Sequence, residues 1–335
     1  MSKKRRYRAS PSQHEVNVKA IKMMSPSGWR LLGSDIVPLI GTVPKDYLCY
    51  GDIKNKKSVG FIAKKSRMES TTGLDCVTEE IISKIGDLLP LEMAQSKLVR
   101  LSKTDIRFLS KDFKKRDQEE LIHGIEIAAQ FFDAITDDVE TAFQLDEKPE
   151  EKRFYSLSNV MNFFDGVFKE HAKQLRFDFI KMIAFDAFVG APDRHAMNWG
   201  VLASHESSQY KVRFSPVFDT ARGLFREISD RELKEKIEKQ GKSGFIEQYA
   251  NRSKPILSID NSLDLNHFGL IKCIFDENKF SDQDALLTIF KAVNICDIRH
   301  MLQLKFRRII TQFRMDLICD LLTYRIDRIS KDLQL

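Results

Sequence analysis

The chain has 335 residues, a formal net charge of +6 and 42% apolar residues. This length can bury a large core and predicts more than one structural unit. No apolar run is long enough to span a membrane, and none follows the basic start as in a signal peptide. The five scattered cysteines predict reduced thiols. We expect a cytoplasmic bacterial protein, and secretion into a host cell by a specialised system stays open as an alternative.

The N-terminus is a basic, polar tail. Residues 1–20 contain four consecutive basic residues at 3–6 and a further arginine, Arg8, and we predict that this segment is disordered. Such a tail could touch nucleic acid or anionic lipid, but nothing else in the sequence requires nucleic acid.

Two short strands are predicted next, at 47–50 and 58–65, joined by a basic turn at 54–57. Lys64 and Lys65 end the second strand. Successive side chains of a strand point to opposite faces, so the pattern alone does not choose between the two lysines. A tight Gly-x-Gly-x-x-Gly loop is missing, because only the ends of the segment 51–60 are glycine.

A helix is predicted after this hairpin. Thr78 is placed to cap its N-terminus, Glu79 and Glu80 fall in its first turn, and apolar residues follow at helical spacing over 81–89. First-turn glutamates are favoured by the helix dipole, so they need no further function.

The rest of the chain is predicted to be mostly helical. Apolar residues recur at helical spacing over 118–132, 158–173, 175–189, 282–293, 297–313 and 315–331. Gly190 and Pro192 end the third of these helices, so Asp193 lies just past a helix end. Strands predicted at 199–202 and 210–218 form a hairpin that folds Asp219 back toward Asn198.

Asp193, Asn198 and Asp219 have the chemistry of a phosphoryl-transfer site. Magnesium prefers oxygen ligands and usually takes one or two carboxylates plus substrate phosphates. Asn198 and Asp219 can supply those oxygens, which leaves Asp193 to accept a hydrogen bond from an incoming hydroxyl. Because Asp and Asn are also common in turns, only the three residues together, with the hairpin between them, favour this hypothesis.

The segment 185–202, which includes Asp193-Arg194-His195 and Asn198, together with 216–219, resembles the HipA-like serine/threonine protein kinases. The order Asp-Arg-His is also similar to that of phosphatidylinositol 3/4-kinases. The resemblance implies an α+β, bilobal protein-kinase-like fold, with a small β-rich N-lobe over 21–115 and a larger helical C-lobe over 116–335. It implies an ATP- and magnesium-dependent phosphotransferase, in which Asp193 is catalytic and Asn198 and Asp219 bind the metal.

The same resemblance assigns residues of the N-lobe. Lys64 is similar to the family's ATP-binding lysine, and Glu79, rather than Glu80, is expected to pair with it. The segments 90–100 and 105–113 resemble the next two strands, so backbone groups of Lys111 and Phe113 are expected to hold adenine. In the family a serine near the phosphate-binding loop can be autophosphorylated; the candidates here are Ser58, Ser66, Ser70, Thr71 and Thr72.

The expected partners are a protein substrate with serine or threonine and a regulatory protein or antitoxin. A lipid or small-molecule kinase of related fold and a pseudokinase-like interaction module are the alternatives. An interaction module would not need Lys64, Glu79, Asp193, Asn198 and Asp219 together, which argues against it. The turn after Asp219 departs from the serine-rich turn common in the family. Its Arg222 is expected to contact a phosphate or a substrate acid, or to form a structural ion pair.

Overall fold

The computed structural model describes residues 16–25, 27–32, 45–51, 58–66, 73–102, 105–115, 118–135, 155–204, 211–220, 222–259, 264–277 and 282–335. Several sequence predictions lie outside these residues: most of the basic tail, the basic turn at 54–57, and the candidate phosphorylation sites Ser70, Thr71 and Thr72.

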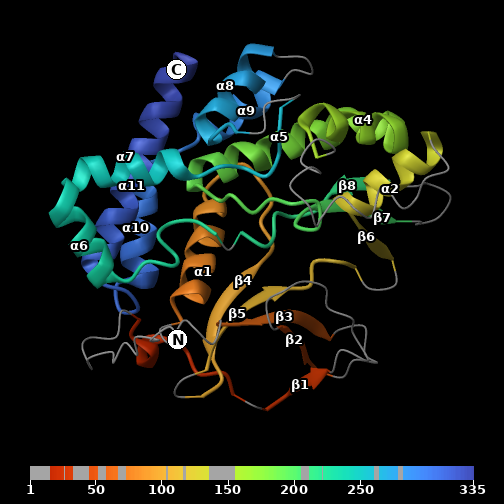
Figure 1. Ribbon diagram of the computed structural model, residues 1–335. Helices are drawn as coiled ribbons and strands as arrows, with labels where there is room; N and C mark the ends of the chain where they lie inside the picture. The colour runs from red at the N-terminus through yellow and green to blue at the C-terminus, as the bar shows by residue number, and fades with distance from the viewer. Residues whose placement is uncertain are drawn as a thin grey trace, which may run out of the picture.

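The N-terminal part is a five-stranded antiparallel sheet in the order β1-β2-β3-β5-β4 (Figure 1). Its strands are β1 Trp29–Leu32, β2 Lys45–Tyr50, β3 Val59–Lys65, β4 Ser96–Arg100 and β5 Ile106–Lys111. The predicted pairing of the strand near 47–50 with that near 58–65 is confirmed, with Tyr47 opposite Ile62. A small core of Leu48, Ala63, Val99 and Leu109 lies on this sheet.

Helix α1, Leu74–Gly86, packs against β4 and β5 and lies between the sheet and the helical part (Figure 1). The prediction that Thr78 caps this helix is wrong, because the helix begins one turn earlier. Gly73 permits that start: its φ is +69°, and an added Cβ would lie 2.4 Å from Ile106 Cδ1. The extra turn buries Leu74 and Val77, and it carries Glu79 from the helix end into its buried interior.

A second, three-stranded antiparallel sheet has the order β6-β7-β8, with strands β6 Glu119–His123, β7 Gly200–Ser204 and β8 Lys211–Phe214. The prediction of one helix over 118–132 is wrong in its first part, because 119–123 form a strand before helix α2, Gly124–Ile135. Leu121 and Ile122 suit a strand as well as a helix, and pairing with β7 selects the strand.

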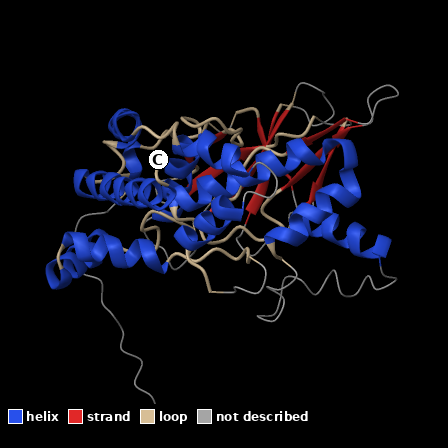
Figure 2. Ribbon diagram, turned by 90° about the horizontal axis from the view of Figure 1, so that it is seen from above, coloured by secondary structure: helices blue, strands red, loops and turns tan. Residues whose placement is uncertain are grey.

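The C-terminal part is mostly helical (Figure 2). The second half of its helix α5, Ala172–Val189, is almost entirely buried. Helices α4, α8, α9 and α11 all pack against α5. The helices are α4 Leu157–Phe168, α5 Ala172–Val189, α6 Asp230–Gln240, α7 Lys242–Arg252, α8 His267–Glu277, α9 Asp282–Phe290, α10 Ile295–Phe306 and α11 Gln312–Leu333, with 3-10 turns η1 Val18–Ala20 and η4 Lys169–His171. None of the described helices is both long and apolar enough to cross a bilayer. The predicted α+β class, with a sheet-rich N-terminal part and a helical C-terminal part, is confirmed.

Candidate active site

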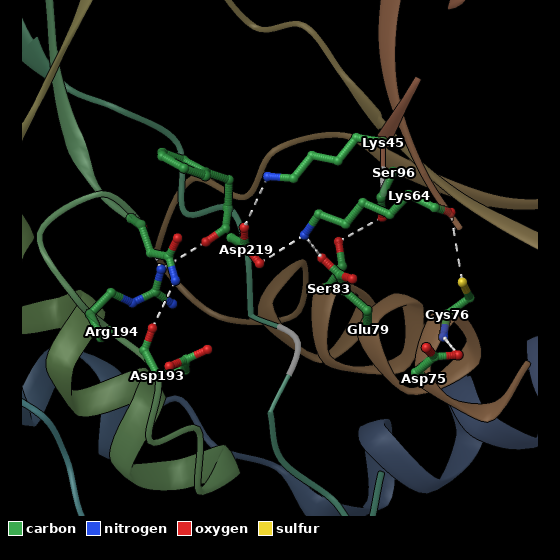
Figure 3. Close-up of polar contacts among 12 residues, drawn as sticks. Lys45, Lys64, Asp75, Cys76, Glu79, Ser83, Ser96, Asp193, Arg194 and Asp219 are labelled. Carbon is green, nitrogen blue, oxygen red and sulfur yellow. Dashed lines mark hydrogen bonds and ion pairs between the residues drawn. The ribbon is translucent and has the colours of Figure 1, made fainter. Parts of the chain in front are cut away.

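Lys64, at the end of β3, lies at the centre of a buried cluster of charges (Figure 3). Its Nζ forms an ion pair with Glu79 of α1 and lies 2.8 Å from Asp219 Oδ1. The predicted pairing of Lys64 with Glu79 is therefore present. Lys65 is exposed, and Glu80 lies next to Lys84 instead.

The charges of this cluster stabilise one another. Burial alone would lower the pKa of Lys64, but Asp219 and Glu79 outweigh burial and raise that pKa. Burial would raise the pKa of Asp219, yet the nearby ammonium groups, first that of Lys64, hold it well below its usual range. Glu79 has a raised pKa because burial outweighs its attraction to Lys64. Asp219 is thus ionised at neutral pH, as a cation ligand must be.

Asp193 and Asn198 lie on the loop between α5 and β7. Gly190 ends α5 in the left-handed conformation, with φ +72°. Asn198 Nδ2 donates a hydrogen bond of 2.8 Å to the carbonyl of Asp193, and Asn198 is 6% exposed. Because the amide nitrogen makes this bond, the other end of the amide, Oδ1, is the acceptor that remains for a ligand.

Arg194 joins this loop to the strand segment that leads to Asp219. Its guanidinium makes a buried, two-point ion pair with Asp186 of α5, with bonds of 2.7 and 2.8 Å. Its Nη1 also donates to the carbonyls of Asn198 at 2.6 Å and Phe218 at 2.7 Å. The sequence analysis did not assign Arg194. The available signal was Asp186, an acid in an otherwise apolar half of a helix, eight residues before the arginine.

Asp219 is held beside α1 by main-chain hydrogen bonds between the segment just before it and the segment that follows α1. Val217 N donates to the carbonyl of Glu92 at 2.7 Å, and Ala94 N donates to the carbonyl of Val217 at 3.0 Å. Asp219 itself has a φ of +52°, an uncommon conformation for a residue with a side chain. Strain of this kind clusters at functional sites, where the surrounding structure holds it.

The predicted adenine-binding residues lie at the end of β5. The main-chain N–H of Lys111 already donates to the carbonyl of Gln95 at 2.7 Å, so only its carbonyl suits an adenine amino group. Two residues on, the ring of Phe113 lies 5.6 Å from that of Phe218, the residue before Asp219. This ring contact joins the end of β5 to the segment that carries Asp219.

Two basic residues, Arg222 and Lys45, reach the carboxylates of Asp193 and Asp219. Arg222 Nε lies 3.2 Å from Asp193 Oδ2, so the arginine forms an ion pair within the chain. Lys45 of β2 reaches to within 3.9 Å of Asp219 Oδ2. No sequence pattern indicated Lys45, because its place depends on the register between β2 and β3.

The donor set fits a magnesium ion better than a softer metal. Asn198 and Asp219 offer hard oxygen atoms, and the described residues contain no group of three or more His, Cys, Asp or Glu side chains that could hold a metal alone. A site with two protein oxygens relies on phosphate oxygens to complete the coordination, as magnesium sites in kinases do.

Comparison with known proteins agrees with this geometry. Residues 38–263 match the model of the HipA-like C-terminal domain. The chain is 25% identical over 238 residues to the serine/threonine-protein kinase CtkA of Helicobacter pylori (strain J99 / ATCC 700824). That match spans 70% of this chain and 65% of the relative, so about a third of the relative's length is not matched.

Two solved structures share the fold. The crystal structure of the Helicobacter pylori proinflammatory kinase CtkA superposes with a TM-score of 0.66 at 20% identity, covering 88% of this chain and 94% of that one. HipA of Shewanella oneidensis MR-1, solved in a complex with HipB and operator DNA, gives a TM-score of 0.52 at 10% identity over 92% of this chain and 73% of that one.

Proposed function

The chain belongs to the family of proteins with a HipA-like C-terminal domain, and from this premise we propose that it is an ATP- and magnesium-dependent kinase acting on serine or threonine in proteins. We further propose that residues 21–115 form the nucleotide-binding lobe and 116–335 the lobe with the catalytic loop. The observation that carries the proposal is the contact of Lys64 with both Glu79 and Asp219.

In this proposal each residue of the cluster has a separate task. Lys64, aligned by Glu79, binds phosphate oxygens, and Asn198 Oδ1 with the Asp219 carboxylate holds magnesium. A bound magnesium ion would neutralise charge on the phosphate oxygens. The Lys111 carbonyl and the Phe113 N–H bind the adenine edge. Because Lys64 is bonded to Asp219 in this structure, its ammonium has to exchange that carboxylate for phosphate oxygens when the nucleotide enters.

Asp193 is the proposed catalytic residue. Its carboxylate would orient the substrate hydroxyl and accept its proton, while Asn198 holds the backbone of Asp193 by the 2.8 Å hydrogen bond. Arg194 keeps the loop in register with the segment before Asp219, so the base and the metal ligand stay at a constant separation. Catalysis in such a site comes mainly from positioning and charge neutralisation.

Protein substrates are proposed from the name of the Helicobacter pylori relative, a serine/threonine-protein kinase. A regulatory partner protein is proposed because the Shewanella HipA was solved together with HipB. Autophosphorylation is proposed on the same family basis, with Ser58 and Ser66 as the candidates within the described residues.

The test is incubation of the purified protein with magnesium and γ-labelled ATP, alone and with a generic protein acceptor. We expect label in phosphoserine or phosphothreonine. Asp193→Asn, which keeps the size of the side chain, should abolish the label, whereas Glu238→Gln, a change at an exposed residue of α6, should not. Label transferred to lipid or a small molecule but not to protein would contradict the substrate class. Normal ATP binding without label on protein would favour a lipid or small-molecule kinase, and no ATP binding at all would favour an interaction module.

A further inference from the structure

Residues 16–24 join the helical part of the chain to the edge of the N-terminal sheet, and we call them the strap. At one end, Asn17 N donates a hydrogen bond of 2.7 Å to the carbonyl of Ile309, in the link between α10 and α11. At the other end, Met24 N donates to the carbonyl of Arg100, the last residue of the edge strand β4, at 2.9 Å. Figure 1 shows the strap in red near the label N, below α1. The strap therefore connects two parts of the molecule that are far apart in the sequence.

Arg100 and two apolar side chains fix the strap in place. The Arg100 carbonyl accepts from Met24, its main-chain N–H donates to the carbonyl of Lys22 at 3.1 Å, and its Nε donates to the carbonyl of Ile21 at 2.9 Å. Val16 and Ile21 are 1% and 2% exposed and belong to the main apolar core, which also contains residues of α1, α10 and α11. Burial of one such side chain contributes about 1.5–3 kcal/mol, so the strap is held firmly at both ends.

The strap and the chain crossing to the helical part lie at opposite ends of β5. The chain leaves the sheet after Lys111, the last residue of β5, on its way to β6. The strap instead holds Arg100, which pairs with Ile106, the first residue of β5. The two attachments are separated by the length of β5, about 17 Å at the usual rise of a strand. A single crossing leaves two bodies free to rotate about it, whereas a second attachment at this distance restricts the rotation.

The contact of Lys64 with Asp219 depends on how the two parts of the chain are placed. Lys64 belongs to the N-terminal sheet, whereas Asp219 follows β8 of the second sheet. The main-chain bonds of Val217 to Glu92 and Ala94 cross between the same two parts. Hinge opening, a motion by which kinases admit and release ligands, would lengthen these contacts together. An attachment that opposes this opening therefore acts on the candidate active site.

We propose that the strap is a second connection between the lobes, which limits their separation and keeps Asp219 within reach of Lys64. The inference rests on the proposed kinase function and adds to it a device that controls how freely ATP exchanges at the site. The match to the HipA-like C-terminal domain assigns no role to the strap, because the matched residues 38–263 include neither the strap nor Ile309.

The experiment combines amide hydrogen exchange with steady-state kinetics. The proteins are the wild type, Ile21→Ala, which weakens a buried anchor, and the control Met23→Ala, a change at a half-exposed residue of the same strap. In Ile21→Ala the amides of Val217 and Ala94 should exchange at least about tenfold faster, whereas the amides of α5 should keep their rates. The KM for ATP should rise about 3- to 10-fold, because the arrangement that binds ATP is less populated. Saturating ATP restores that arrangement, so kcat should change by less than about twofold. Met23→Ala should match the wild type in both measurements.

Equal acceleration of exchange in α5 and at Val217 would overturn the inference, since it would indicate a loss of global stability only. Unchanged exchange at Val217 and Ala94 would overturn it as well, and so would a fall in kcat at unchanged KM, which reports a smaller fraction of active enzyme. If Ile21→Ala does not fold, Arg100→Met, which removes the side-chain bond to the strap, is judged by the same exchange pattern. Hydrogen exchange needs no activity. Selectively faster exchange at Val217 and Ala94, in a protein whose wild type transfers no phosphate, would support the strap and refute the kinase function.

Discussion

Arg222 Nε lies 3.2 Å from Oδ2 of Asp193, so the carboxylate that we propose as the proton acceptor is paired with a cation in this structure. Arg222 lies three residues after Asp219, so one short stretch of sequence supplies both the proposed metal ligand and the partner of the proposed base. Its side chain is 43% exposed, which makes the pair easy to exchange for a substrate hydroxyl.

Because the ion pair of Arg222 with Asp193 is partly exposed, removing it should have only a small effect on activity and stability. Ion pairs that are partly exposed contribute about 1 kcal/mol or less, so Arg222→Gln should lower kcat by at most about fivefold and leave the melting temperature nearly unchanged. The measurement is phosphate transfer in parallel with thermal unfolding, with Asp193→Asn as the reference. A loss as severe as that of Asp193→Asn would mean that Arg222 itself contacts the reacting groups.

Glu79→Gln should impair catalysis while the protein stays folded. Lys64 now shares its charge between Glu79 and Asp219. The amide keeps the size of the side chain but removes the charge of Glu79, so Lys64 should pair with Asp219 alone. We expect kcat/KM to fall by about 10- to 100-fold, the worth of one charge-assisted hydrogen bond. The matched control is Glu80→Gln, one residue along α1 and directed to Lys84, which should change kcat/KM little. Equal effects of the two substitutions would contradict the assignment of Glu79.

Glu80 predicts a pH dependence of stability. Burial, only partly opposed by Lys84, raises the pKa of Glu80 from 4.5 to about 7, and its Oε2 has no hydrogen-bond partner. The folded state therefore binds this proton more tightly than the unfolded state, so the Glu80 contribution to stability falls as pH rises from about 4.5 to about 7. Above pH 7, Glu80→Gln should be more stable than the wild type by up to about 3 kcal/mol.

The difference between Glu80→Gln and the wild type should vanish below about pH 4.5, where the carboxyl is protonated in both states. This stability difference is measured by urea unfolding at several pH values. The control is Glu120→Gln, a substitution at an exposed residue. A stability difference that does not vary with pH would show that Glu80 is ionised in the folded protein across this range.

Arg194→Lys should destabilise the protein strongly. Lysine cannot reproduce the two-point contact with Asp186 together with the bonds to the carbonyls of Asn198 and Phe218. Breaking a buried ion pair costs about 3–5 kcal/mol, because a buried charge is left uncompensated. Arg231→Ala, which removes an 80% exposed arginine, is the control and should change stability by less than about 0.5 kcal/mol.

The free energy of unfolding from denaturant titration measures this effect. The double variant Arg194→Met, Asp186→Leu should recover part of the stability but not the transfer activity, because both charges are gone while the loop has lost its bonds to the carbonyls. A mild effect of Arg194→Lys on both stability and activity would show that the loop is held by other contacts.

Local patterns in the sequence predicted the strands near 47–50 and 58–65 and the helix that ends before Asp193. They were wrong at Thr78, since the start of α1 depends on Gly73 and on burial against β5. They were also wrong for 119–123, where they predicted a helix. The apolar residues of this segment suit either a helix or a strand, and hydrogen bonding to β7 selects the strand. In each case a strand distant in the sequence, β5 or β7, takes part in the decision.

By itself the sequence determined the chemistry of the candidate site, because residue type alone decides that Asp193, Asn198 and Asp219 offer oxygen atoms and that Lys64 offers a charge. Spacing along the chain also placed Asp193 after a helix. Only the tertiary structure decided which charges meet. Lys64 and Asp219 are 155 residues apart, and Lys45 enters the site through strand register. Such contacts follow from the packing of two sheets and a helix against one another, and this packing leaves no trace in the residues next to them.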